Sequence, residues 1–571
     1  MYLDYEVAIP NMPGKITYDK KKDSTYVKYE YGRTYDAGKK YTYVQRATIG
    51  KRSGKDASKM YPNANFIKYF PNTELPQTRE LSSRCCCLRA GGYIIIKKLA
   101  YETGIEAIAD TVFERKEKGL FLDLVAYNII SENNAGQYYP DYAYNHPLFT
   151  EGMQIYSDST VSRFLNSVTE DEIQSFLNRW NTDREHKEKI YISYDSTNKE
   201  SSAGKIEMVE MGHTKKDQTG RIFNYSLAYD TNNREPLFYE EYAGSIVDIS
   251  QLEHMIGKAI GYNYRNVGFT LDRGYFSSEN MRYMDKHGYP FIIMVKGKEK
   301  LINELVMSRK GTFENNRSCS IRDYKVYGTT VKHELCAGDR ERYFHIYHSP
   351  YREANEKEKV EEKIDHLKVN LEKKKGRPIE ELNDVFKKYF DLYPDEKGNL
   401  SFYVENPIVI ERERDLCGYF AIITSEEMTA KEALTLYKNR DASEKLFRAD
   451  KSYLGNKSLR VYGNESASAK IFIGFVALII RSAIYTRIKD AVIKSGKRDN
   501  FMTVPAVVKE LEKIELSRQI EGTYRLDHSV TATQKEILKA FWVDEGYVKT
   551  KCESICNDLK IVMSSDAQAR G

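Results

Sequence analysis

Residues 266–295, NVGFTLDRGYFSSENMRYMDKHGYPFIIMV, carry the pattern that decides the fold. Residues 266–272 and 290–295 are short apolar runs of strand length. The residues between them, 278–287, have the spacing of a helix, which Gly288 ends. A strand, a helix and a second strand in this order indicate an α/β domain.

Three further strands and one helix are predicted before this stretch, at residues 189–195, 223–230, 236–242 and 252–260. The complete order is βββαβαβ, and aspartates close the first strand, at Asp195, and the fourth strand, at Asp272. This succession is the layout of a ribonuclease-H-like core. The predicted fold class is therefore α/β, with a mixed sheet of that type.

A later helix is predicted to begin at Thr429, where Thr429-x-x-Glu432 forms a capping box, and to run to Gly455. Four of its side chains lie within a sector of about 60° and form a stripe about 20 Å long: Tyr437, Arg440, Glu444 and Lys451. Leu436 lies outside this sector and is expected on the packed side. An exposed helix would by itself explain the stripe, because Arg440 and Glu444 have salt-bridge spacing.

The strand-end aspartates favour a catalytic interpretation of the stripe. Two carboxylates at adjacent strand ends, with a third on a helix packed across the sheet, can hold two divalent cations roughly 3.5 to 4 Å apart. Such a pair activates water or a 3′-OH and stabilises the leaving oxygen. Asp195, Asp272 and Glu444 are therefore the candidate catalytic residues and metal ligands, for two divalent cations.

The stripe has the spacing Y-x2-R-x3-E-x6-K, within NRDASEKLFRADKSYL. Here the chain resembles the bacterial insertion-sequence transposases of the D-D-E type that carry a Y-R-E-K signature. The resemblance extends through VGFTLDRGYF, SAKIFIGFVALII and, more weakly, ATIGKR, and so covers most of the chain. It implies a cut-and-paste DNA transposase with the three carboxylates as ligands of two Mg²⁺ ions, which Mn²⁺ can replace. The other stripe residues, Tyr437, Arg440 and Lys451, would contact the phosphates of the transposon ends.

The resemblance also implies an insertion in the core. Asp195 and Asp272 are 77 residues apart, whereas Asp272 and Glu444 are 172 apart. Relatives place a β-rich insertion domain in the longer interval, and residues 301–415 fit it.

Two departures from the family pattern stand out. Relatives can use a tryptophan of the insertion to stack a flipped base, but Trp180 and Trp542 both lie outside residues 301–415. Rings that could stack instead are Tyr327, Tyr343, Phe344 and Tyr347. The apolar helix of relatives often begins with His, where this chain has Lys470.

Five regions are expected along the chain: a basic tyrosine-rich β-module (1–75), a helical DNA-binding region (76–185), the catalytic domain (186–300 and 416–490), the insertion domain (301–415) and a C-terminal helical region (491–571). Within the second region, residues 159–166 and a further helix start at Thr169 resemble a helix-turn-helix pair. Ser162, Arg163 and Asn166 share one helical face and are the candidates for DNA contact, although plain helical packing gives the same pattern.

Residues 15–55 hold twelve Lys or Arg against four Asp or Glu, a net charge of +8. Rings alternate with polar residues around Asp36-Ala-Gly38, which predicts a β-hairpin with one face of tyrosines. Such a module is either a solubilising terminus or an element that contacts the DNA backbone.

Composition restricts the class of protein. With 571 residues, 41% hydrophobic and 30% charged, a single core and extensive disorder are both excluded. The net charge of +5 is too small to identify a partner, and tyrosine is unusually frequent, with 45 Tyr against 23 Phe. Eight Cys form neither a disulfide framework nor a zinc-binding pattern.

No membrane association or export is expected. The first residues lack a signal-peptide pattern. The most apolar run, residues 471–480, is about ten residues long where a bilayer span needs about 20, so a buried helix is expected. We expect a cytoplasmic protein associated with the bacterial nucleoid.

The sequence therefore predicts a DNA transposase that cuts element ends by two-metal hydrolysis and joins the 3′-OH to target DNA. The expected partner is double-stranded DNA, both transposon ends and target, bound by a homodimer. Two alternatives stay open: a metal-dependent nuclease without strand transfer, and an inactive DNA-binding protein derived from an element.

Overall fold

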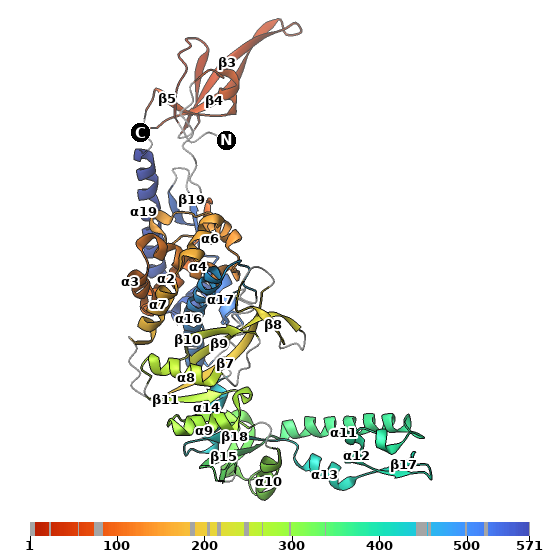
Figure 1. Ribbon diagram of the computed structural model, residues 1–571. Helices are drawn as coiled ribbons and strands as arrows, with labels where there is room; N and C mark the ends of the chain where they lie inside the picture. Colours follow the sequence, from red (N-terminus) through yellow and green to blue (C-terminus); the bar gives the residue numbers. More distant parts are fainter. Residues whose placement is uncertain are drawn as a thin grey trace.

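The protein has three parts with separate hydrophobic cores: an N-terminal β-module, a central body built on a large sheet, and a projecting arm (Figure 1). The computed structural model describes residues 6–21, 24–54, 56–73, 84–182, 189–201, 206–213, 219–244, 251–264, 266–295, 299–336, 338–440, 454, 458–496, 500–518 and 523–569.

The N-terminal β-module is a five-stranded antiparallel sheet with the order β1-β5-β4-β3-β2, covered by one short helix. Its elements are β1 (Val7–Ala8), β2 (Ile16–Lys21), β3 (Ser24–Asp36), β4 (Tyr41–Arg52), β5 (Lys59–Pro62) and α1 (Ala64–Tyr69). The hairpin predicted around Asp36 is confirmed, since β3 and β4 pair on either side of the turn at residues 37–40.

Helices from both ends of the described chain pack together in the central body. They are α2 (Gly91–Glu102), α3 (Ile105–Val112), α4 (Arg115–Ser131), α5 (Tyr139–Asn145), α6 (Asp158–Ser167), α7 (Glu170–Thr182), α16 (Asn464–Ser495), α17 (Val504–Leu511), α18 (Ala532–Ala540) and α19 (Glu545–Ala569). The strands β6 (Cys87–Arg89), β19 (Glu515–Arg518) and β20 (Tyr524–Leu526) join the same two regions in a small antiparallel sheet.

Helix α16 confirms the buried helix expected at residues 471–480. It is long and apolar enough to cross a membrane, but 89% of its most apolar window is buried inside the protein. The ring of Phe472 stacks on Phe121 with centroids 5.3 Å apart and meets the edge of Phe176 at 5.1 Å. Helix α16 therefore lies in the core that the helices share with the sheet.

The central sheet has ten strands: β7 (Ile190–Glu200), β8 (Glu210–His213), β9 (Thr219–Asp230), β10 (Glu235–Ala243), β11 (Val267–Leu271), β12 (Phe291–Met294), β13 (Ser320–Ile321), β14 (Val326–Glu334), β15 (Glu341–His348) and β18 (Tyr419–Thr424). Their order is β10-β9-β7-β11-β12-β18-β15-β14-β13, and β8 pairs with β9. Only the neighbours β7, β11 and β12 are parallel. The fold is thus mixed α/β, as predicted, and β11 is buried at every residue, as expected of a central parallel strand.

Helices cover both faces of this sheet. Helices α8 (Leu252–Gly261) and α9 (Ser278–Lys286) bury their apolar side chains in the main core. Helix α14 (Ala430–Asn439) packs in a separate cluster with Tyr191 and Ile422 on the opposite face. A further helix, α10 (Glu299–Arg309), follows β12.

Two sequence-based boundaries differ from the structure. Strand β7 does not end at Asp195 but runs to Glu200, because its antiparallel pairing with β9 continues after the parallel strand β11 stops at Leu271. Residues 301–415 were expected to form one β-rich insertion, yet β13, β14 and β15 extend the central sheet. Pairing between strands that are far apart in the sequence leaves no local signal in the sequence.

The arm comprises residues 350–417 and is mainly helical. It contains α11 (Pro350–Glu372), α12 (Asp384–Tyr389), β16 (Phe390–Pro394), β17 (Leu400–Glu405) and α13 (Pro407–Asp415). Its core is built from side chains such as Ile364, Phe386 and Leu400. Figure 1 shows this arm leaving the body sideways from the end of the sheet near β15 and β18.

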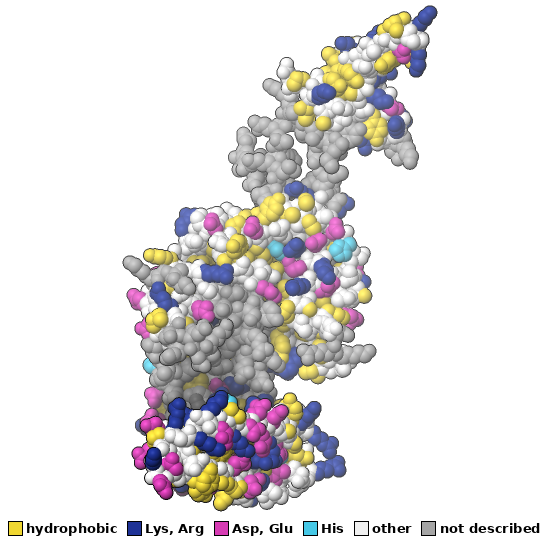
Figure 2. Space-filling view, turned by 90° about the vertical axis from the view of Figure 1, so that its right-hand side faces the viewer, with side chains coloured by type: hydrophobic (Ala, Val, Ile, Leu, Met, Phe, Trp, Pro, Cys, Tyr) yellow, Lys and Arg dark blue, Asp and Glu magenta, His cyan; other side chains and the backbone are white. Residues whose placement is uncertain are grey.

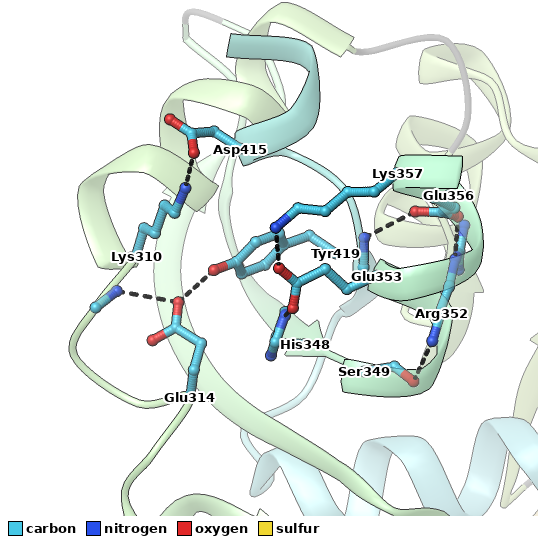
Figure 3. A network of polar contacts seen from close by, with 12 residues as sticks. Lys310, Glu314, His348, Ser349, Arg352, Glu353, Glu356, Lys357, Asp415 and Tyr419 are labelled. Atoms are coloured by element: carbon cyan, nitrogen blue, oxygen red, sulfur yellow. Dashed lines mark hydrogen bonds and ion pairs between the residues drawn. The ribbon is translucent and has the colours of Figure 1, made fainter. Parts of the chain in front are cut away.

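The chain enters and leaves the arm through a network of polar contacts (Figure 3). Glu353 accepts hydrogen bonds from Lys357 at 2.6 Å and pairs with His348 at 2.9 Å. Tyr419 donates to Glu314 at 2.5 Å, and this bond helps to lower the pKa of Glu314 against the effect of burial. The His348–Glu353 pair ties α11 to β15, and the Tyr419–Glu314 bond ties β18 to the segment that follows α10.

Gly418 at this root has a positive φ of 87°, and a Cβ there would come within 2.7 Å of the Glu353 Cβ. We expect Gly418→Ala to lower the free energy of opening of α11 by about 2 to 3 kcal/mol, from the left-handed backbone and the forced contact together. Native-state hydrogen exchange of the α11 amides measures this. Gly398→Ala is the matched control, since Gly398 has a φ of 81° but no atom within 4 Å of its Cβ position. Equal losses in both variants would contradict the steric part of the prediction.

Candidate active site

The backbones of two aspartates of the predicted site lie side by side. The last registered pair of the parallel strands β7 and β11 is Tyr194 with Leu271. Asp195 and Asp272 each follow this pair by one residue, so their backbones are neighbours at the carboxyl end of β11. The side chain of Asp195 is not among those that the structure describes. Asp272 is the N-cap of a 3-10 turn, Arg273–Tyr275, and turns away from the sheet.

Arg440 of the signature reaches this point from the other face of the sheet. Its Nη1 lies 3.1 Å from the Asp272 Oδ1, and the two side chains are 10% and 35% exposed. Arg440 is the C-cap of α14 and stands 168 positions after Asp272 in the chain. Neither the spacing nor the composition indicated this ion pair, and sequence reasoning missed it.

Tyr437 positions Arg440. Its ring is 5% exposed within the cluster around α14, and the Arg440 Cζ lies 5.3 Å from the ring centroid, within range of a cation–π contact. The capping box predicted at Thr429 is confirmed. Leu436 is partly buried and packs against the cluster around α14, as expected, but Tyr437 and Arg440 of the stripe lie on the packed side as well. Tyr437 is therefore buried beneath the guanidinium instead of standing open to solvent.

The rest of the stripe lies outside the described residues. Helix α14 ends at Asn439, and the predicted continuation to Gly455, with Glu444 and Lys451, falls outside the residues described. Among the described residues, no three His, Cys, Asp or Glu side chains come together to hold a metal ion. Two carboxylate residues side by side nevertheless fit Mg²⁺, which binds through oxygen ligands and needs few protein carboxylates.

Residues just after the signature contact β7 and α16. Ser458 bridges to Glu200 at the end of β7, and its carbonyl accepts a hydrogen bond from Asn134 at 3.3 Å. Lys470 of α16 donates to the carbonyl of Leu459, and burial lowers the pKa of Lys470 to about 7. Lys470 thus holds the segment that follows the signature against α16.

The predicted DNA-contacting residues of the helical region lie on one exposed face. Ser162, Arg163 and Asn166 are all exposed on α6, and Arg163 donates to Thr160 at 3.1 Å. The second helix of the pair, α7, packs against the central sheet near its C-terminal end. Its Trp180 is 1% exposed and donates to the Pro236 carbonyl of β10 at 3.0 Å. Whether the α6 face contacts DNA stays a prediction.

The rings proposed as base-stacking platforms differ in accessibility. Phe344 and Tyr347 are fully buried in the sheet, so neither can stack on a base. Tyr327 and Tyr343 are half-buried. Phe344 packs in the main core and Tyr347 in the cluster around α14, because β15 belongs to the central sheet and not to the separate insertion expected at residues 301–415.

Just over half of the chain matches a known protein family. A family model described as "Transposase DDE domain" matches residues 191–480. No curated protein matches the chain. A solved structure of a piggyBac transposase synaptic complex with hairpin DNA is similar, with 10% identity and a TM-score of 0.33 over 74% of this chain and 76% of that chain. Because the family match covers 290 of 571 residues, the protein belongs to the DDE transposase family and is a DNA transposase.

Proposed function

We propose that this protein is a cut-and-paste transposase of the bacterial insertion-sequence type with a Y-R-E-K signature. It would cleave the ends of its element by phosphodiester hydrolysis and join the freed 3′-OH to target DNA. The observation that carries this proposal is the ion pair between Arg440, the C-cap of α14, and Asp272, which follows β11 and whose backbone lies beside that of Asp195 in β7.

The topology around these residues supports a ribonuclease-H-like catalytic domain. Numbered along the chain without the edge strand β8, the first five strands have the spatial order 3-2-1-4-5. The first three are antiparallel, and the fourth and fifth run parallel to the first. Helices on both faces complete the layered arrangement.

In this proposal Asp195, Asp272 and Glu444 hold two Mg²⁺ ions, which Mn²⁺ can replace. The ions supply an activated water or 3′-OH and stabilise the charge on the leaving oxygen. Arg440 exchanges its partner when DNA binds, leaving the Asp272 carboxylate for a phosphate oxygen. Both partners are anions that a guanidinium can bind in bidentate geometry. Tyr437 holds the guanidinium in place from below, and Lys451 adds a further phosphate contact.

We propose double-stranded DNA as the partner, both as transposon ends and as target, held by a homodimer so that two ends are paired. Ser162, Arg163 and Asn166 of α6 would contact the DNA before the catalytic domain does. A protein that acts in this way belongs in the cytoplasm, on the bacterial nucleoid.

The test uses the full-length protein with linear DNA carrying both ends of its element, a supercoiled target plasmid and Mg²⁺. The proposal expects cleaved ends that become joined to the plasmid. Cleaved ends that never join would identify a nuclease without strand transfer. Binding of the ends without any cleavage, in Mg²⁺ and in Mn²⁺, would identify an inactive DNA-binding protein.

A further inference from the structure

The hairpin of the N-terminal β-module continues beyond its sheet as a free two-stranded ribbon, residues 32–46. Strand β2 pairs with β3 only as far as Tyr29, and β5 pairs with β4 only from Gly50 onward. Between these limits β3 and β4 pair only with each other, up to Asp36 and Tyr41. Figure 1 shows this ribbon projecting away from the central body.

The ribbon exposes aromatic rings on both of its faces. Tyr41 and Tyr43 share one face, and their exposed fractions are 51% and 41%. Tyr35 pairs with Thr42 and so lies on the other face, 62% exposed. The expectation of a single tyrosine face is therefore wrong. Two-stranded ribbons are only marginally stable in water, so rings exposed on both faces favour a surface that is covered by a partner.

The charge of the ribbon identifies the kind of partner. Its basic residues are Arg33, Lys39, Lys40 and Arg46, and its acidic residue is Asp36. The Asp36 carboxylate already accepts hydrogen bonds from the backbone of Gly38 and Lys39, at 2.9 and 3.1 Å. Within the described part of the chain, no ion pair engages Lys39, Lys40 or Arg46, whereas Arg33 pairs with Glu30 at 2.7 Å. Figure 2 shows dark blue side chains at the free end of this ribbon.

The arm provides a contrast within the same molecule. Residues 350–417 contain 14 Lys or Arg and 17 Asp or Glu, a net charge of −3. Many of these charges pair with one another, as Lys363 does with Glu413 at 3.1 Å. Figure 2 accordingly shows mixed colours on the end of the arm. The excess of positive charge is therefore a property of the ribbon and is not shared by the other projecting element, the arm.

We propose that residues 32–46 are a DNA-binding element that lies in the major groove of double-stranded DNA. The groove is about 12 Å wide and admits a two-stranded β-ribbon. Lys39, Lys40 and Arg46 contact phosphates on its walls, and the tyrosines pack against sugars and base edges. The proposal rests on the proposed function in taking duplex DNA as the partner, and adds a binding site away from the catalytic residues.

The test compares two triple variants of the full-length protein without metal ion, so that no cleavage is needed. One carries Lys39→Ala, Lys40→Ala and Arg46→Ala. The matched control, Lys359→Ala, Lys373→Ala and Lys397→Ala, removes the same charge from exposed arm positions. Affinity for a labelled random-sequence duplex of about 30 base pairs is measured by fluorescence anisotropy at several salt concentrations. Protection of guanine N7 from dimethyl sulfate reports on the major groove.

Loss of three phosphate contacts is expected to reduce the slope of log affinity against log salt by about 2.7 in the ribbon variant. Guanine N7 protection is also expected to fall, while the control keeps both. An unchanged slope in the ribbon variant, or equal losses in both variants, overturns the proposal. The proposal is also overturned if the ribbon variant loses affinity for single-stranded DNA alone, or if its only change is lower solubility. A duplex that binds through the ribbon but is never cut contradicts only the proposed function.

Discussion

Replacing Asp272 by asparagine is expected to abolish both cleavage of element ends and their joining to target DNA, with a loss of at least about 10³-fold in rate. The amide keeps the shape of the side chain but removes the charge that a divalent cation requires. Asp272 lies beside Asp195 in register and already binds a cation, the Arg440 guanidinium at 3.1 Å. The rate of strand cleavage in excess Mg²⁺ is the measurement.

A matched control separates the loss of charge at the site from the loss of an ion pair. Asp339 pairs with Arg282 at 2.9 Å, away from the candidate site, so Asp339→Asn breaks a comparable contact and should retain cleavage. Circular dichroism and duplex binding should be unchanged in Asp272→Asn. Cleavage by Asp272→Asn at the wild-type rate would show that Asp272 is not a metal ligand.

Strands and helices with a clear period could be predicted from the sequence. Alternating or continuous apolar residues predicted β9, β11 and β12, and these strands lie at the predicted positions. Capping signals likewise predicted α9 and α14. These features are local, because each depends on residues within one or two turns or on one strand. The neighbourhood of Asp195 and Asp272 followed from the expected layout of the sheet.

Features that depend on distant partners could not be predicted. Strand β7 continues past Asp195 because β9 offers it backbone hydrogen bonds, and β15 joins the sheet because β18 returns beside it after the arm. The burial of Tyr437 depends on the face of α14 that meets the sheet, since both sides of this helix carry large side chains. The pair between Arg440 and Asp272 joins two elements whose approach only the folded chain defines.

Replacing Arg440 by glutamine is expected to slow cleavage by about 10² to 10³-fold, the cost of losing one preorganised donor to a developing charge. The geometry adds a second, opposite effect. In the absence of DNA the guanidinium neutralises Asp272 and repels any divalent cation that approaches the same carboxylate. Without that repulsion, Mn²⁺ binding to the DNA-free protein should tighten about tenfold. Calorimetry or electron paramagnetic resonance of Mn²⁺ measures this directly.

The two opposite effects distinguish a partner exchange from a purely structural role of Arg440. If Arg440 only held α14 against the sheet, its loss would weaken metal binding together with cleavage. Arg282→Gln, which removes the guanidinium of the Arg282–Asp339 pair, should change neither quantity and serves as the control. Slower cleavage with unchanged or weaker Mn²⁺ binding would contradict the exchange. Slower cleavage with tighter Mn²⁺ binding would mean that the DNA-free protein binds its metal weakly until a DNA phosphate draws Arg440 away from Asp272. Metal binding and DNA binding would then be coupled through the Arg440 side chain.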